Sequence, residues 1–232
     1  MRYLLLLIIT LFTGVITGQN EGFRNNADAL VLAANATQGS FGATAHFTNP
    51  KRTTDGSVYL FKKWKNYAMI VTINDEKFSL NNINLNIEKN VFVSKISEDS
   101  IFTFNFNNID KFIVNNRKFK SFYHINENRV FEVIYESDDF TIMKGYRVSL
   151  IEGSANPMIN RKNNKLVQKS SIYVMKGNDI NSFKLSKKRI LALIGNDAER
   201  VNKIEQFASE NRLSYKDPID VRSMLEHCCL NN

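Results

Sequence analysis

The stretch FEVIYE, which begins at Phe131, decides the fold class because its apolar residues recur at every second position. Phe131, Val133 and Tyr135 occupy the alternate positions. Successive side chains of a β-strand point to opposite faces of the sheet, so these three side chains would share one face. The pattern predicts a half-buried strand that carries Glu132 and Glu136 on its solvent face.

The same two-residue period recurs through residues 58–173. Apolar residues alternate with others in INLNI at 83–87, in IFTFNF at 101–106 and in YRVSLI at 146–151. Pairs of Asn, Asp or Glu, which mark turns, stand between such stretches. Strands joined by short loops must be mostly antiparallel, because parallel strands need crossovers of about a dozen residues or more. We therefore expect an antiparallel β domain over residues 58–185, folded as an open sheet, a barrel or a sandwich with one buried face.

The period changes to a helical one from Ser186 onward. Ser186 can cap a first helix, and Asn196 or Asp197 can cap a second. Asp217 is followed by proline, and an N-cap residue with proline in the first turn marks the start of a third helix. We expect a C-terminal subdomain of about three short helices at residues 186–232, so the fold class is mainly β within an α+β chain.

Residues 1–18 read MRYLLLLIITLFTGVITG, an arginine followed by an apolar run and a small residue. This is the layout of a cleaved secretory signal peptide. The run is shorter than the roughly 18–20 residues of a membrane-spanning helix, and a retained anchor is the competing interpretation. We expect an exported protein, in the periplasm or associated with the outer membrane, without a transmembrane helix after cleavage. Residues 19–57 would form an N-terminal arm, in which 28–34 can make a short helix.

The sequence lacks the residue patterns that carry familiar chemistry. Its three histidines are scattered, and its two cysteines, Cys228 and Cys229, are adjacent, so neither set has the spacing of a zinc site. The sequence contains no nucleophile elbow, zinc-protease helix or Walker loop. We expect no metal, no cofactor and no enzymatic activity. A hydrolase that works with two carboxylates is the outlying alternative.

Positive charge is concentrated near the end of the predicted β domain. The chain carries 31 Lys and Arg against 23 Asp and Glu, and the only acid among residues 161–189 is Asp179. We predict that this basic segment binds a protein partner in the outer membrane or envelope, with an anionic lipid or glycan as the alternative. Nucleic acid is not expected for an exported protein, and a merely solvated face would have the same composition. The basic residues are Arg161, Lys162, Lys165, Lys169, Lys176, Lys184, Lys187, Lys188 and Arg189.

Three features carry a resemblance to known proteins. They are the signal that ends in TGQ at 17–19, the block GSVYLFKKW at 56–64 and the block IEGSANPMINRKNNKLVQKSS at 151–171, in a chain rich in Asn, Lys and Ile. In these features the chain resembles small exported envelope proteins of Bacteroidota. In size, compartment and β-rich class it is also similar in kind to the periplasmic plug of the type IX secretion translocon.

The resemblance implies an accessory or plug-like subunit that binds an outer-membrane protein complex, with protein transport by type IX secretion as one setting. The alternative is a soluble periplasmic binder of a glycan or an apolar ligand. Asp99, Ser100 and Ile101 also resemble the D-S/T-aliphatic acceptor at which exported proteins of Bacteroidota are O-glycosylated. Because these residues fall at a predicted turn, we take Ser100 as a candidate O-glycosylation site.

Overall fold

Parts of the sequence-based predictions lie outside the described residues. These parts are the signal peptide, most of the N-terminal arm with its helix at 28–34, and Arg161 and Lys162 of the basic segment. The computed structural model describes residues 24–25, 42–46, 54–153, 163–195 and 197–229.

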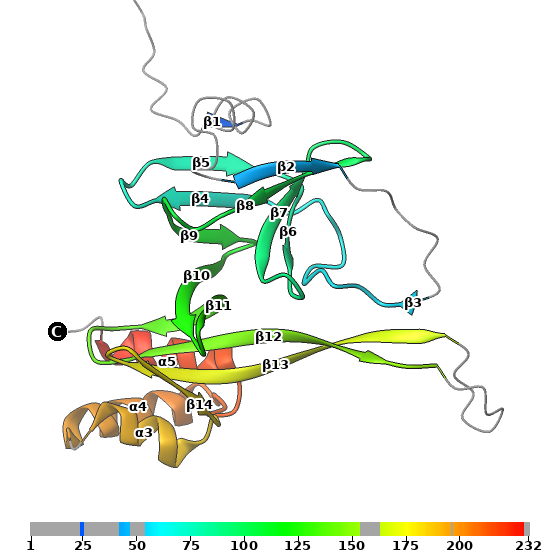
Figure 1. Cartoon of the computed structure of the whole chain (residues 1–232). Coiled ribbons are helices and arrows are strands. Elements are labelled where there is room, and N and C mark those ends of the chain that lie inside the picture. The colour runs from blue at the N-terminus through cyan, green and yellow to red at the C-terminus, as the bar shows by residue number, and fades with distance from the viewer. Residues whose placement is uncertain (1–23, 26–41, 47–53, 154–162, 196, 230–232) are drawn as a thin grey trace, which may run out of the picture.

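The fold is mainly β with antiparallel sheets and short C-terminal helices, which confirms the predicted class (Figure 1). The helices are α3 (Lys187–Ile194), α4 (Ala198–Glu210) and α5 (Pro218–Cys229). The strands are β1 (Arg24–Asn25), β2 (Gly42–His46), β3 (Thr54–Asp55), β4 (Ala68–Thr72), β5 (Lys77–Leu80), β6 (Ile83–Asn86), β7 (Val91–Lys95), β8 (Ser100–Phe104), β9 (Ile109–Val114), β10 (Arg117–His124), β11 (Glu127–Glu136), β12 (Thr141–Ile151), β13 (Asn164–Lys176) and β14 (Asp179–Phe183).

The strands are arranged in two sheets. One sheet has ten strands, in the order β1-β5-β4-β9-β10-β11-β12-β13-β14 with β3 paired to β13, and the other has four, in the order β2-β8-β7-β6. The described pairings are antiparallel except for the short parallel pairs β1–β5 and β3–β13. Neither sheet closes into a barrel, which removes one of the three predicted arrangements.

Tight turns rich in asparagine connect the central strands. Asn115 and Asn116, between β9 and β10, have φ angles of 49° and 63°, and Ile125 and Asn126, between β10 and β11, have 49° and 64°. Two successive residues with positive φ form a hairpin turn whose twist matches that of the flanking strands. Asparagine tolerates this conformation better than most residues, so these positions set the register of the two hairpins.

The first apolar core lies between the two sheets and is rich in phenylalanine. Phe92 of β7 stacks on Phe112 of β9 with ring centroids 4.3 Å apart, and Phe104 of β8 meets the same ring edge-on at 5.3 Å. Each of these side chains is at most 2% exposed. Full burial of a side chain of this size contributes about 1.5–3 kcal/mol, so this cluster is a major source of the attraction between the sheets.

Strand β6 is buried on both faces, although its alternating pattern predicts burial on one. Ile83 and Leu85 enter the first core, while Asn84 is only 1% exposed. The Asn84 side chain accepts a hydrogen bond from the Phe61 N–H at 2.9 Å and donates one to the Phe61 carbonyl at 2.8 Å. A buried amide is tolerated when it is hydrogen-bonded, so the polar position here marks a contact with the chain at Phe61.

The three helices form a second apolar core against the other end of the ten-stranded sheet. Ile142 of β12, Ile190 of α3, Ile204 of α4 and Val221 of α5 are fully buried there. Among the described residues, α4 is the longest helix with 13 residues, and none of the helices is long and apolar enough to cross a membrane.

Each of the three helices begins at a predicted capping residue, and two of these residues make side-chain capping hydrogen bonds. The Asp197 side chain accepts a hydrogen bond from the Arg200 N–H at 3.1 Å, and Asp217 Oδ1 accepts one from the Ile219 N–H at 2.7 Å. Ser186 stands at the N-cap position of α3, but its side chain makes no capping hydrogen bond. The predicted short C-terminal helices are therefore present.

The hairpin of β12 and β13, whose strands are the two longest among the described residues, projects beyond the body of the molecule (Figure 1). Its strands pair along the whole of β12, whereas β11 leaves β12 after the pair Phe131–Gly145. We call the part beyond that point, residues 146–151 with their partners 165–170, the arm. Six residues at roughly 3.3 Å each make the arm about 20 Å long.

Candidate functional site

One row of side chains across the ten-stranded sheet joins the first core to the second. The strand registers align its members directly side by side, and two neighbours within the row, Glu132 of β11 and Lys144 of β12, are charged. The others are apolar and belong to, or pack against, one core or the other. In order, the row contains Phe78, Ile70, Phe112, Phe119, Glu132, Lys144, Ile172 and Phe183.

Glu132 is held by three hydrogen bonds from two side chains. Arg117 of β10 donates from Nε to Oε1 at 2.8 Å and from Nη2 to Oε2 at 2.7 Å. The Tyr146 hydroxyl also donates to Oε2 and accepts from Arg117 Nη2. The Arg117 guanidinium lies 5.3 Å from the ring centroids of both Phe61 and Phe119. This two-point binding is among the strongest arrangements for a carboxylate and fixes its orientation.

The surroundings of Glu132 shift the pKa of two groups in opposite directions. Burial works to raise the pKa of Glu132, but the hydrogen bonds from Arg117 and Tyr146 and the charges of Arg117 and Lys144 outweigh it, so the pKa lies below its usual value. Burial and the nearby Glu132 carboxylate raise the pKa of Tyr146. At neutral pH the cluster therefore consists of a charged acid, a charged guanidinium and a neutral phenol.

The position of Glu132 corrects the prediction that both glutamates of the FEVIYE stretch face solvent. Glu132 is 9% exposed, whereas Glu136 is exposed as predicted. The pairing of β11 with β12 shifts between Val133 and Tyr135, which leaves Ile134 as an extra residue in a β-bulge. The bulge reverses the alternation, so Glu132 and Glu136 lie on opposite faces of the sheet.

Two adjoining hollows lie between the β9–β10 turn, the end of β11 and α5, and we call them together the junction groove. Ladder pairing of β11 with β10 ends at Val133, so the next three residues of β11 border the groove without a partner from β10. The hollow at the charged row has a volume of about 500 Å³, and the hollow near Glu136 about 530 Å³. Both are bordered by Asn116, Val133, Ile134 and Arg222.

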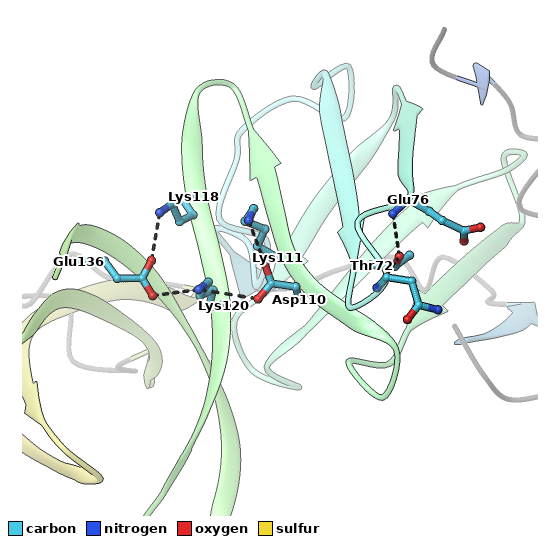
Figure 2. Close-up of polar contacts among 8 residues, drawn as sticks. Thr72, Glu76, Asp110, Lys111, Lys118, Lys120 and Glu136 are labelled. Atoms are coloured by element: carbon cyan, nitrogen blue, oxygen red, sulfur yellow. Dashed lines mark hydrogen bonds and ion pairs between the residues drawn. The ribbon is translucent and has the colours of Figure 1, made fainter. Parts of the chain in front are cut away.

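A second ionic cluster lies on the sheet face that carries Glu136 (Figure 2). Glu136 accepts hydrogen bonds from Lys118 at 3.0 Å and Lys120 at 2.8 Å, and Lys120 Nζ also lies 3.7 Å from Asp110 Oδ1. Lys111 donates to the other Asp110 oxygen at 2.9 Å. Each of these side chains is 21–39% exposed, so each pair contributes at most about 1 kcal/mol.

The predicted basic segment does not form one surface, which corrects the expectation of a single basic site. Two members lie on the arm, one lies at the β13–β14 turn, and four lie at or near the start of α3. The first and the third are eleven positions apart on one strand, about 36 Å at roughly 3.3 Å per residue. In that order the described members are Lys165, Lys169, Lys176, Lys184, Lys187, Lys188 and Arg189, all of them exposed.

The arm gains a basic face from a residue outside that segment. Arg147 of β12 stands directly opposite Lys169 of β13, and both are exposed. Lys165 follows on the same face, opposite Ile151. Like charges directly opposite each other across two strands are destabilising, so the fold tolerates an unfavourable contact here. Leu150, which is 53% exposed, lies beside Ile151 at the end of the arm.

The cations near α3 are partly engaged. Lys187 Nζ lies 3.0 Å from Glu205 Oε1 and links α3 to α4. That leaves Lys184, Lys188 and Arg189 as exposed cations for which the structure shows no ion pair with another described residue.

Ser100 is placed differently from the exposed acceptor that the sequence predicts. The turn precedes it, where the Ile96 and Ser97 N–H groups donate to the Ser100 carbonyl at 3.0 and 3.3 Å. Ser100 itself is the first residue of β8 and is buried at 9% exposure. A glycan on this hydroxyl would need β8 to open locally, so the structure disfavours the site.

His124, His227 and Cys228 pack against other side chains of the described residues. Among these residues, no group of three or more His, Cys, Asp or Glu side chains could hold a metal ion. The His124 ring meets Phe131 and Tyr173 edge-on at 6.0 and 5.7 Å, and His227 stacks on Phe207 at 3.9 Å. Cys228 is 3% exposed within the second core.

Sequence reasoning placed Glu132 on a solvent face, without a role in a site, and did not single out Arg117, Lys144 or Tyr146. The hairpin turn at Asn126 offered a signal, because counting outward from it places Glu132 opposite Phe119 and near Arg117. Comparison with known proteins adds no further guide, because no family model, curated protein or solved structure matches the chain.

Proposed function

We propose that this chain is an exported, non-enzymatic protein that docks through its arm on an acidic surface of an envelope protein complex. Support for export comes from the signal-peptide pattern of residues 1–18. Support for docking comes from one observation above all. Arg147 and Lys169 are exposed and directly opposite each other on a hairpin that projects from the body.

The charge on the arm is not neutralised by the described part of the chain. There, Arg147, Lys165 and Lys169 have no acid within ion-pair distance. A carboxylate-rich surface placed over Arg147 and Lys169 would attract both cations and offset the repulsion between them. Complementary charge of this kind speeds encounter and selects the partner.

The arm also offers apolar contacts and a strand edge. Leu150 and Ile151 are consecutive in a strand, so they point to opposite faces and can anchor the arm on both sides. On the side away from β13, residues 147–151 of β12 have no strand partner among the described residues. An edge of this kind can accept an added strand from a partner, with backbone hydrogen bonds supplying affinity.

The test is a pull-down of the tagged full-length protein from gently solubilised envelopes, with bound proteins identified by mass spectrometry. The arm variant carries Arg147→Gln, Lys165→Gln and Lys169→Gln. The control variant carries Lys184→Gln, Lys188→Gln and Arg189→Gln, which removes the same charge beside α3. We expect a stoichiometric envelope partner with the wild type and the control, its loss with the arm variant, and its release as salt is raised. A partner that the arm variant retains, or a wild type that brings down none, would overturn the proposal.

A further inference from the structure

We propose that the junction groove is a binding site for a small organic carboxylate with an apolar body. This site is separate from the arm and does not rest on the docking function. The hollow at the charged row, about 500 Å³, lies between β11, β12 and the first turn of α5. Its volume falls within the roughly 300–1,000 Å³ of typical small-molecule sites.

The charged groups around this hollow leave one cation without an ion-pair partner among the described residues. Arg117 binds both oxygens of the Glu132 carboxylate. Arg222 Nε donates to Glu226 Oε1 at 2.8 Å, and Asp217 accepts hydrogen bonds from backbone N–H groups at the start of α5. The remaining cation that lines the hollow is Lys144, which forms no ion pair with a described residue.

Lys144 is placed to bind an anion. The residue is half-buried, and its ammonium lies 5.5 Å from the Tyr146 ring centroid, with no ion pair to any acid in the described residues. An ammonium has three donors, and Arg117 and Tyr146 already supply three hydrogen bonds to the two Glu132 oxygens. A half-buried ammonium is screened less than a surface one, so an arriving anion gains more from it.

The hollow is also lined by apolar side chains. Ile219, in the first turn of α5, is 74% exposed, and Pro218 precedes it. Val133 and Ile134 of β11 line the hollow as well. An exposed isoleucine and an ammonium without an ion pair in the same hollow suit a ligand with a carboxylate at one end and a hydrocarbon body at the other.

Lys144, the one cation lining this hollow that has no ion pair with a described residue, also sets the charge of the ligand. Tight phosphate sites use a free arginine fork or several converging donors, and the Arg117 fork is occupied by Glu132. A monoanion matches this one ammonium. A dianion would place excess negative charge beside the buried Glu132 carboxylate, which is unfavourable.

The experiment uses octanoate as the probe, with 1-octanol and inorganic phosphate as matched controls. Backbone amide shifts of the full-length protein are followed by NMR during each titration. We expect octanoate to shift residues around Lys144, Ile134 and Ile219 saturably, while 1-octanol and phosphate bind at least about tenfold more weakly, because each lacks one half of the contact. Octanol or phosphate binding equal to octanoate, or no saturable shift at the groove, would overturn the proposal.

Three variants locate the binding. Lys144→Gln should weaken octanoate at least about tenfold by removing a charged hydrogen bond. Ile219→Ser, at an exposed position that tolerates change, should weaken it about threefold to tenfold by removing apolar contact. Lys169→Gln, on the opposite face of the arm, should bind like the wild type. Unchanged binding in both groove variants contradicts the site. Loss of envelope binding by the arm variant with octanoate binding intact would show that the two sites act independently.

Discussion

Glu132 and Lys144 are direct cross-strand partners, and they occupy the point where an apolar row of the sheet is interrupted between two cores. Lys144 faces an acid whose oxygens are already bound by Arg117. One carboxylate therefore serves two cations, and both the stability of the junction and the charge of the groove depend on it.

Removal of the Glu132 carboxylate should destabilise the protein strongly. Glu132→Ala leaves a half-buried guanidinium without its partner, because Glu132 is the acid that pairs with Arg117 and no other described acid does so. We expect a loss of about 2–4 kcal/mol in the free energy of unfolding, measured by urea denaturation. Glu127→Ala, at a side chain that is 65% exposed, should change it by no more than about 0.5 kcal/mol. Equal effects of the two substitutions would contradict a structural role for Glu132.

Acid should destabilise the wild type partly through Glu132. Its folded-state pKa lies below the usual value of 4.5, so its contribution is present above that pH and is lost as the pH falls through the folded pKa. Urea unfolding at neutral pH and at acid pH should show a smaller loss for Glu132→Gln than for the wild type. Other carboxylates act equally on both proteins, so the difference isolates Glu132. Parallel curves for the two proteins would argue against the lowered pKa.

The Tyr146 hydroxyl should stabilise the cluster modestly. Tyr146→Phe removes a donor to Glu132 and an acceptor for Arg117 without changing the ring, so we expect a loss of about 1 kcal/mol. Tyr123→Phe, at 67% exposure, is the matched control and should have little effect. Burial raises the pKa of both Tyr146 and Tyr215, so an ultraviolet alkaline titration should keep a smaller late-ionising component in Tyr146→Phe. A late component of unchanged amplitude would show that Tyr146 does not contribute to it.

Gly145, the residue of β12 directly before the arm, should not tolerate a side chain, because two aromatic rings already occupy the space that a Cβ would need. A Cβ there would lie 2.9 Å from the Tyr173 ring and 3.0 Å from that of Phe131, which is only 1% exposed. We expect Gly145→Ala to lower the free energy of unfolding by about 2–3 kcal/mol. Gly177→Ala meets no atom within 4 Å but has φ of 57°, and should cost about 1 kcal/mol. The reverse order of the two losses would contradict the close packing at Gly145.

The features that the sequence predicts correctly depend on nearby residues. Asp197 and Asp217 cap helices through bonds to N–H groups two or three residues away, and the turn at Asn115 and Asn116 depends on those two residues alone. The two-residue strand period and the helical period are local too, so the β class follows from the first and the helical end from the second. Helix capping and turn formation depend on residues within about four positions of each other, so both can be predicted from the sequence.

The features that it predicts wrongly depend on distant contacts. The extra residue Ile134 places Glu136 on the opposite face of the sheet from Glu132. The alternating sequence pattern does not predict this bulge. The basic segment looks continuous in sequence, but β13 is extended and carries Lys165 far from Lys176. Arg147 lies outside the segment and is brought to Lys169 only by the register of the hairpin.

The interrupted row also bears on how the molecule opens. Strands β10 to β13 are hydrogen-bonded neighbours in one sheet. Along the row of side chains that crosses these strands, however, packing against the phenylalanine-rich first core ends at Glu132, and packing against the second core with the helices begins beyond Lys144. Cooperative units follow packing more than backbone continuity. The helical end can therefore unfold and refold while the phenylalanine core stays intact, so amide hydrogen exchange would divide the chain into two units whose border crosses the middle of one sheet.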